Sequence, residues 1–229
     1  MKRFLVMLLI MILGGVFVPL TSCASIISGG VSESELVART WRDGAYEITF
    51  IDLTHRISAD GWLTKWSFYA QYYSAPGFPP TLDPRKVQLK IFRDPGALST
   101  VYQFVGQSPM VNVDQGWDKV YSFDLANIPV KKDDIIGWYY PTLSPETPGG
   151  VIAAAQFTGT DTRWVYNNAY SLGNIESEVS KVVFPFNGEW RTYSIRVEGT
   201  DVAPVPLPTS LLLLAPGLAA LAMIRRKLN

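Results

Sequence analysis

The stretch GWLTKWSFYAQYY, residues 61–73, decides the fold predicted for this chain. It opens on an Asp60-Gly61 turn and then alternates with a period of two, which is typical of a β-strand because successive side chains point to opposite faces. One face is mainly apolar and carries Trp62, Thr64, Trp66, Phe68, Ala70 and Tyr72. The other carries Leu63, Lys65, Ser67, Tyr69, Gln71 and Tyr73. We expect the first set in a core and the second set at the surface.

Segments of the same kind recur along the chain, separated by turn signals such as Asp83-Pro84 and Pro95-Gly96. Further strands are predicted at 46–53, 86–92, 101–105, 120–125, 135–140, 151–157, 163–166 and 192–198, and one short helical turn at 32–39. Short strands without helix-length crossovers predict an all-β fold. We expect an antiparallel two-sheet sandwich, jelly-roll-like, over residues 25–202.

The first 24 residues have the three parts of a secretory signal peptide: two basic residues, an apolar run at 4–18 and a small-residue end. Cleavage after Ser22-Cys23-Ala24 would leave Ser25 as the first residue. The run Leu20-Thr21-Ser22-Cys23 also resembles a bacterial lipobox, in which Cys23, the sole cysteine, becomes a lipidated N-terminus. Both interpretations stay open, and a retained membrane helix is a third.

Charge limits the partners of the exported part. The chain has 20 basic and 20 acidic residues, and five of the basic ones lie in the terminal segments: Lys2, Arg3, Arg225, Arg226 and Lys227. The remaining 15 basic and 20 acidic residues give a net charge of about −5. A mildly acidic domain does not attract a phosphate backbone, so nucleic acid is not predicted as a partner. A single cysteine also excludes an internal disulfide.

The chain closes on VPLPTSLLLLAPGLAALAMIRRKLN, residues 205–229. Its apolar run at 211–224 is about 14 residues, or about 21 Å as a helix, against the roughly 20 residues of a comfortable membrane span. The run therefore predicts a marginal transmembrane helix. The basic cluster Arg225-Arg226-Lys227 predicts a cytoplasmic end, which places the preceding domain on the opposite side of the membrane.

This terminal order of Val205-Pro206-Leu207-Pro208, an apolar helix and Arg225-Arg226-Lys227 resembles the PEP-CTERM sorting signal in its VPLP variant. The resemblance covers about the last 25 residues. It departs from the commonest form at Leu207, where many members carry Glu, and at Thr209, where Ala is frequent. It implies recognition by an exosortase, a membrane cysteine transpeptidase-like enzyme that would cut near the proline motif and send the domain to the surface. Such proteins occur in Gram-negative bacteria that make exopolysaccharide, and a simple tail anchor is the alternative.

Catalytic and metal chemistry has little support in the sequence. His55 is the only histidine and Cys23 lies in the signal segment, so a catalytic triad would depend on His55, for which we expect a surface or capping role. Four aspartates in predicted loops offer oxygen ligands for calcium: Asp114, Asp118, Asp133 and Asp134. Aspartate also favours turns, and turns are the prediction here. No metal and no cofactor is predicted.

The aromatic content, 7 Trp, 11 Tyr and 11 Phe, favours carbohydrate as a ligand, because flat rings stack on sugar rings. The outward residues predicted to bind are Tyr69, Tyr73, Lys65 and Gln71, and Trp117 and Trp190 in turns are further candidates. Core packing is the alternative for the aromatic residues of strands. Six glutamates are available as paired carboxylates of a glycosidase, but their spacing marks no two as partners: Glu47, Glu146, Glu176, Glu178, Glu189 and Glu198.

Together these features predict an exported, non-enzymatic surface or extracellular-matrix protein that binds exopolysaccharide weakly. It would be anchored in the inner membrane until its tail is cut, so the predicted partners are the membrane and an exosortase-type processing enzyme. A lipoprotein held through Cys23 and a secreted polysaccharide hydrolase or lyase are the alternatives.

Overall fold

The computed structural model describes residues 25–42, 47–71, 85–113, 118–141, 150–156, 162–166, 174–184 and 191–203. These residues form strands and two short 3-10 helices, η1 (Glu33–Glu35) and η2 (Lys181–Val183). The strands are β1 (Ile26–Gly30), β2 (Trp41–Arg42), β3 (Ile48–Asp52), β4 (Gly61–Ala70), β5 (Arg85–Arg93), β6 (Val101–Gln107), β7 (Val111–Val113), β8 (Lys119–Val130), β9 (Ile135–Tyr140), β10 (Ala153–Gln156), β11 (Thr162–Tyr166), β12 (Val179–Ser180), β13 (Arg191–Tyr193) and β14 (Ile195–Thr200).

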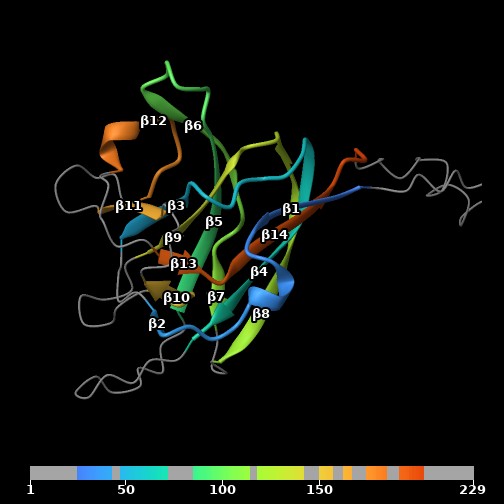
Figure 1. Cartoon of the computed structure of the whole chain (residues 1–229), viewed down its shortest axis with the longest axis vertical. Coiled ribbons are helices and arrows are strands. Elements are labelled where there is room, and N and C mark those ends of the chain that lie inside the picture. Colours follow the sequence, from blue (N-terminus) through green and yellow to red (C-terminus); the bar gives the residue numbers. More distant parts are fainter. Residues whose placement is uncertain are drawn as a thin grey trace, which may run out of the picture.

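The strands form antiparallel sheets in a sandwich-like arrangement (Figure 1), as the sequence predicts. The four-stranded sheet has the order β1-β14-β4-β8, and the large sheet has the order β11-β3-β9-β5-β6-β12 with β7 beside β5. A small sheet, β13-β10-β2, joins the four-stranded sheet at Ser194. The Ser194 amide donates to the Ala153 carbonyl, and its own carbonyl accepts from the Tyr69 amide.

The main core lies between the four-stranded and large sheets and is built around aromatic rings. Phe50 stacks on Trp138 with 5.3 Å between ring centroids, and Trp138 lies 4.5 Å from Tyr193. Trp66 and Phe68 of β4 and Leu89 of β5 enter this core from both sheets. Full burial of one such side chain stabilises the fold by about 1.5–3 kcal/mol, so this core replaces the stability that disulfides give small secreted domains.

The predicted faces of β4 hold only in its second half. Trp66, Phe68 and Ala70 are buried as expected. In the first half the order is reversed, because Leu63 is fully buried in the core and Trp62 is partly exposed. The prediction that Trp62 and Thr64 point inward and Leu63 outward was therefore wrong.

A β-bulge at Thr64 causes this reversal. Lys65 pairs with Glu198 and Leu63 with Gly199, so β4 has one more residue than β14 at this point. An extra residue shifts the alternation by one and exchanges the two faces. Gly199 permits the bulge, because a Cβ atom there would lie 2.2 Å from the Trp62 carbonyl oxygen.

A second apolar cluster covers the outer face of the large sheet. Ile51, Phe92, Tyr102 and Ile135 supply the sheet side, and the segment 174–184 packs on them: Ile175, Val179 and Phe184. Pairing of Val179 with Tyr102, between β12 and β6, fixes this segment to the sheet edge. Both faces of the large sheet are therefore buried here.

The predicted strand at 135–140 recurs unchanged as β9, and the others recur with changed bounds. The clearest change is at β8, which extends over Lys119–Val130 where the sequence predicts 120–125. The predicted strand at 192–198 is divided at Ser194 into β13 and β14, and the predicted helical turn at 32–39 is η1. Four short strands were not predicted: β1, β2, β7 and β12. Strands of two to five residues carry too few side chains for a clear period of two.

Both terminal segments lie outside the described residues. They include Cys23 of the signal segment, the motif Val205-Pro206-Leu207-Pro208 and the basic residues Arg225, Arg226 and Lys227. In the part of the chain that the structure describes, no helix has the length and hydropathy for a membrane crossing.

Candidate functional site

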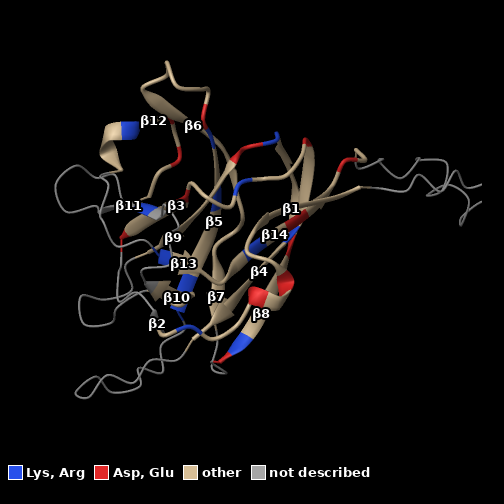
Figure 2. Cartoon of the chain, viewed as in Figure 1, with Lys and Arg blue, Asp and Glu red and all other residues tan. Residues whose placement is uncertain are grey.

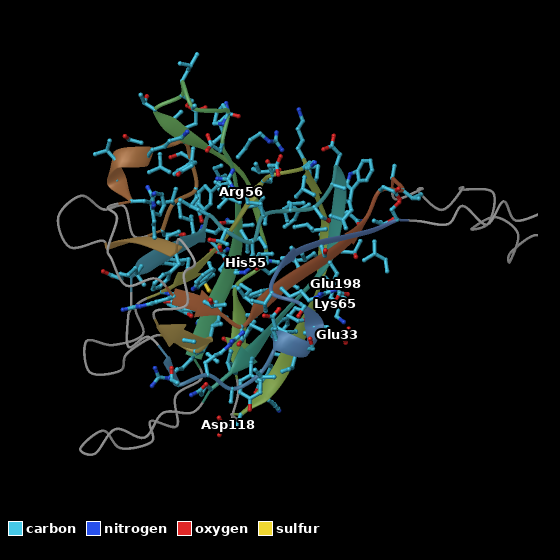
Figure 3. All side chains as sticks on the ribbon, viewed as in Figure 1. Glu33, His55, Arg56, Lys65, Asp118 and Glu198 are labelled. Carbon is cyan, nitrogen blue, oxygen red and sulfur yellow. The ribbon has the colours of Figure 1, made fainter. Side chains whose placement is uncertain are left out.

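The outer face of the four-stranded sheet carries a row of charges across three strands. Lys65 of β4 pairs with Glu198 of β14 on one side and with Asp124 of β8 on the other. Figure 3 shows Lys65 beside Glu198 on this sheet. Glu198 Oε1 also accepts a 2.8 Å hydrogen bond from Arg196 Nε. Lys65 thus stands between two carboxylates of its own sheet.

The residues predicted to bind carbohydrate do not form one continuous platform within the described residues. Tyr69 lies on the same face as Lys65 and is partly buried. Gln71 is engaged by the chain itself: its Nε2 donates to the Arg39 carbonyl and its Oε1 accepts from the Arg39 amide, both at 2.7 Å. Tyr73, Trp117 and Trp190 lie outside the described residues. The Gln71 side-chain amide thus binds the backbone of the segment that leads into β2 through two hydrogen bonds.

A pocket of about 380 Å³ opens at the seam between the edge of the large sheet and the end of β8. We call it the seam pocket, and its lining includes Arg93, Gln103, Phe104, Val105, Pro129 and Lys131. These residues come from β5, β6, β8 and the turn after β8. The sequence analysis did not find this site, because its residues are distant in sequence and no motif links them.

Asp134 organises the cationic side of the seam pocket. Its side chain is almost fully buried, and its two oxygens accept from Nε and Nη2 of Arg93, each at 2.8 Å. Oδ2 also accepts from the Lys131 amide at 2.8 Å, which closes the turn between β8 and β9. The hydrogen bond to Asp134 raises the pKa of Arg93 above its usual value, so this guanidinium stays charged.

The aspartates considered for calcium do not converge. Asp118 precedes β8 and Asp133 and Asp134 follow it, and a strand of 12 residues is about 40 Å long. Asp118 lies at the lower end of Figure 3, far from Arg56, whose Nη1 approaches the Asp133 carbonyl. Asp114 lies outside the described residues, among which no group of three or more metal-binding side chains gathers.

His55 takes part in a capped loop after β3. Its Nδ1 lies 2.8 Å from Oδ2 of Asp52, and Oδ1 of Asp52 accepts from the amides of Thr54 and His55 at 2.8 and 3.0 Å. Asp52 is buried, whereas the His55 side chain is 28% exposed. The hydrogen bond to Asp52 raises the pKa of His55. The Asp52–His55 pair therefore orders the loop.

Lys90 is an unexpected buried cation on the outer face of the large sheet. Its ammonium donates to Gln107 Oε1 at 2.7 Å and lies over the rings of Phe104 and Tyr139, 5.5 and 5.6 Å from their centroids. Burial lowers the pKa of Lys90 to about 8. The alternation of β5 correctly indicates that Lys90 points away from the main core, but the sequence does not show what covers it.

Of the six glutamates considered for glycoside cleavage, two accept side-chain hydrogen bonds within the domain and two lie outside the described residues. Glu176 is exposed and accepts from Gln107 and Asn174, and Glu198 accepts from Arg196. Glu146 and Glu189 lie outside the described residues. The seam pocket has no glutamate or aspartate in its lining.

Comparisons of the chain with known protein families, with curated proteins and with solved structures find no match. The functional proposal therefore rests on the chain ends and on the sites described above.

Proposed function

We propose that this protein is exported, sorted through its C-terminal segment and delivered to the cell surface or matrix as a non-enzymatic β-sandwich that binds exopolysaccharide weakly. The observation that carries the proposal is the position of the two domain ends. β1 and β14 are antiparallel neighbours, and the Ser25 amide donates to Asp201 Oδ1 at 2.9 Å (Figure 1). The signal segment and the motif Val205-Pro206-Leu207-Pro208 therefore attach to one corner of the domain.

The tail supplies the physical basis of sorting. Pro206 and Pro208 lack amide hydrogens and hold the chain extended, so the membrane helix cannot continue into the domain. A short extended peptide outside the membrane is accessible to an exosortase-type enzyme, as the PEP-CTERM resemblance implies. The proposed organisation is a signal peptide at 1–24, a β-sandwich at 25–202 and a sorting segment at 203–229. We include in it a jelly-roll topology for the sandwich, since strands distant in sequence, such as β1 and β14, are neighbours.

A lipoprotein is the second candidate, and the same corner supports it. Cys23 lies two residues before Ser25, so acyl chains on Cys23 would enter the membrane beside the C-terminal helix. The two anchors are compatible, because both signals place the domain on the outer side of the inner membrane. In that case the protein would stay membrane-bound after its tail is cut.

Intact mass of the protein from its native host tests the proposal. We expect a product that begins at Ser25 and ends near Pro208, with no acyl mass. A joint Pro206→Ala and Pro208→Ala variant should keep its full C-terminus, whereas Pro204→Ala, outside the motif, should be processed normally. Acyl mass on Cys23 would establish the lipoprotein. A full-length chain that persists in the envelope would refute sorting by cleavage.

A further inference from the structure

We propose that the seam pocket binds one or two sugar units of an acidic polysaccharide and holds a sugar carboxylate between Lys131 and Arg93. The inference rests on the proposed function, because only an exported domain meets such a polymer, and it adds the site and the ligand class. A volume of about 380 Å³ lies at the lower end of the range of about 300–1,000 Å³ for small-molecule sites. That volume suits one or two sugar units of a polysaccharide and not a large ligand.

The apolar side of the pocket suits the C–H face of a sugar ring. Phe104 and Pro129 belong to its lining. Val105 also reaches it, because β6 has a bulge there: Ile91 pairs with Gly106 and Phe92 with Phe104, which leaves Val105 as the extra residue. Bulges commonly redirect side chains at sheet edges next to binding sites. Aromatic and apolar walls with a few polar groups are the usual composition of a ligand site.

The polar side of the pocket carries an excess of positive charge. Lys131 is exposed, and its ammonium makes no ion pair with another described residue. Arg93 uses Nε and Nη2 to bind Asp134, so Nη1 is left for a ligand. Asp134 and, through its charge, Asp60 act on Arg93, but neither carboxylate belongs to the lining. An anion in the pocket therefore meets two cations and no lining carboxylate. Figure 2 shows basic and acidic positions next to each other at the turn between β8 and β9.

The edge of β6 offers hydrogen bonds for sugar hydroxyls. β12 pairs only with Val101 and Tyr102, so from Gln103 onward the side of β6 that faces away from β5 has no strand partner in the described part of the chain. Backbone donors and acceptors at such an edge are free to bind other groups. The Gln103 side-chain amide adds a donor and an acceptor in the same lining. A neutral amide and an open backbone edge suit hydroxyl groups, while the cations suit the carboxylate.

Binding of defined oligosaccharides to the purified protein tests the proposal. The probes are a trimer of galacturonate, the matching neutral trimer of galactose, and inorganic phosphate as a competitor, measured by calorimetry at low and high salt. We expect the acidic trimer to bind at least about tenfold more tightly than the neutral one, and to weaken with salt. Phosphate at equal concentration should not displace it.

Matched variants locate the site. Lys131→Gln should weaken binding of the acidic trimer about three- to tenfold, because one exposed cation is lost. Lys132→Gln removes the same charge from the next residue, outside the pocket lining, and should leave binding unchanged. Gln103→Ala should weaken binding of both trimers alike.

Three outcomes would overturn the inference. These are no binding of the acidic trimer, equal binding in Lys131→Gln and Lys132→Gln, and full displacement by phosphate, which would show a general anion site. None of them bears on the mass of the processed protein. A result that refutes sugar binding in the seam pocket is thus distinguishable from one that refutes the proposed sorting.

Discussion

The backbone amide of Ser25 donates a hydrogen bond to the Asp201 carboxylate, 2.9 Å away, across 176 positions of the chain. The bond joins the first described residue to the end of the last strand and holds β1 on β14. If the signal peptide is cut after Ala24, the Ser25 nitrogen becomes an α-ammonium group. The carboxylate already makes this hydrogen bond charge-assisted, and a charged donor would add the attraction of an ion pair, so processing would strengthen this contact.

Asp201→Asn tests this relationship. Asparagine keeps an oxygen that accepts the Ser25 hydrogen bond but removes the charge. In protein that begins at Ser25 we expect the free energy of unfolding to fall by up to about 1 kcal/mol, as for exposed ion pairs. In a chain extended before Ser25 the same substitution should cost less, because the amide donor carries no charge. Urea unfolding of both forms gives the comparison, and an equal loss in both would show that the charge of the new terminus plays no part.

The bulge in β4 predicts which of two neighbouring side chains stabilises the core. Leu63→Ala should lower the free energy of unfolding by about 2–5 kcal/mol, because it leaves a cavity in a fully buried position. Trp62→Ala should cost about 1 kcal/mol or less, although it removes more atoms, because Trp62 is partly exposed. Chemical denaturation measures both. A larger loss in Trp62→Ala than in Leu63→Ala would contradict the bulge and support an unbroken alternation along β4.

The lowered pKa of Lys90 predicts that the free energy of unfolding increases at alkaline pH. The pKa of this lysine falls to about 8 in the folded protein, below its usual value of 10.5, so between these values the unfolded chain binds a proton that the folded chain does not. Stability therefore increases as pH rises through this window, by up to about 3 kcal/mol. Urea unfolding at pH 7 and pH 9.5 should show the increase.

Lys90→Met is the control for this effect. It keeps the length of the side chain without the charge, and the gain between pH 7 and 9.5 should shrink. Measurements should stop at pH 9.5, since burial raises the pKa of Tyr139, and its titration has the opposite effect on stability at higher pH. An unchanged gain in Lys90→Met would assign it to other groups.

The raised pKa of His55 predicts that its contribution to the free energy of unfolding decreases as pH rises. Its folded pKa is raised by Asp52, so the protonated form stabilises the fold, fully at pH values below the unfolded pKa and no longer above the folded pKa. Asp52→Asn should lower the pKa of His55, while the amide oxygen of the substituted side chain still accepts from the Thr54 amide. Because His55 is the only histidine, its ring proton resonance follows the titration without ambiguity.

Glu35→Gln is the matched comparison for His55. Glu35 acts on the imidazole only through its charge, whereas Asp52 also accepts its hydrogen bond. The pKa of His55 should therefore fall less in Glu35→Gln than in Asp52→Asn. If the two variants give the same decrease, the Asp52 hydrogen bond is not the main cause of the shift.

Local alternation predicted most of the sandwich but not the sites on it. Val87, Leu89 and Ile91 are buried as their spacing indicates. β9 has the predicted bounds because its continuous apolar run begins directly after the polar turn 131–134, and all of its residues are buried. The burial of Lys90 against Gln107, Phe104 and Tyr139 and the seam pocket depend on contacts between residues distant in sequence. No local pattern contains that information.

The sequence by itself determined that this chain forms antiparallel β-structure, and it supplies the two terminal signals on which the proposed export and sorting depend. The tertiary structure alone decided which half of β4 faces the core, which strand lies beside β1, and where Arg93 and Lys131 meet. The physical reason is that a period of two is a property of neighbouring residues. A bulge at Thr64 or a pairing of Ile26 with Thr200 is instead set by the partner strand across the sheet.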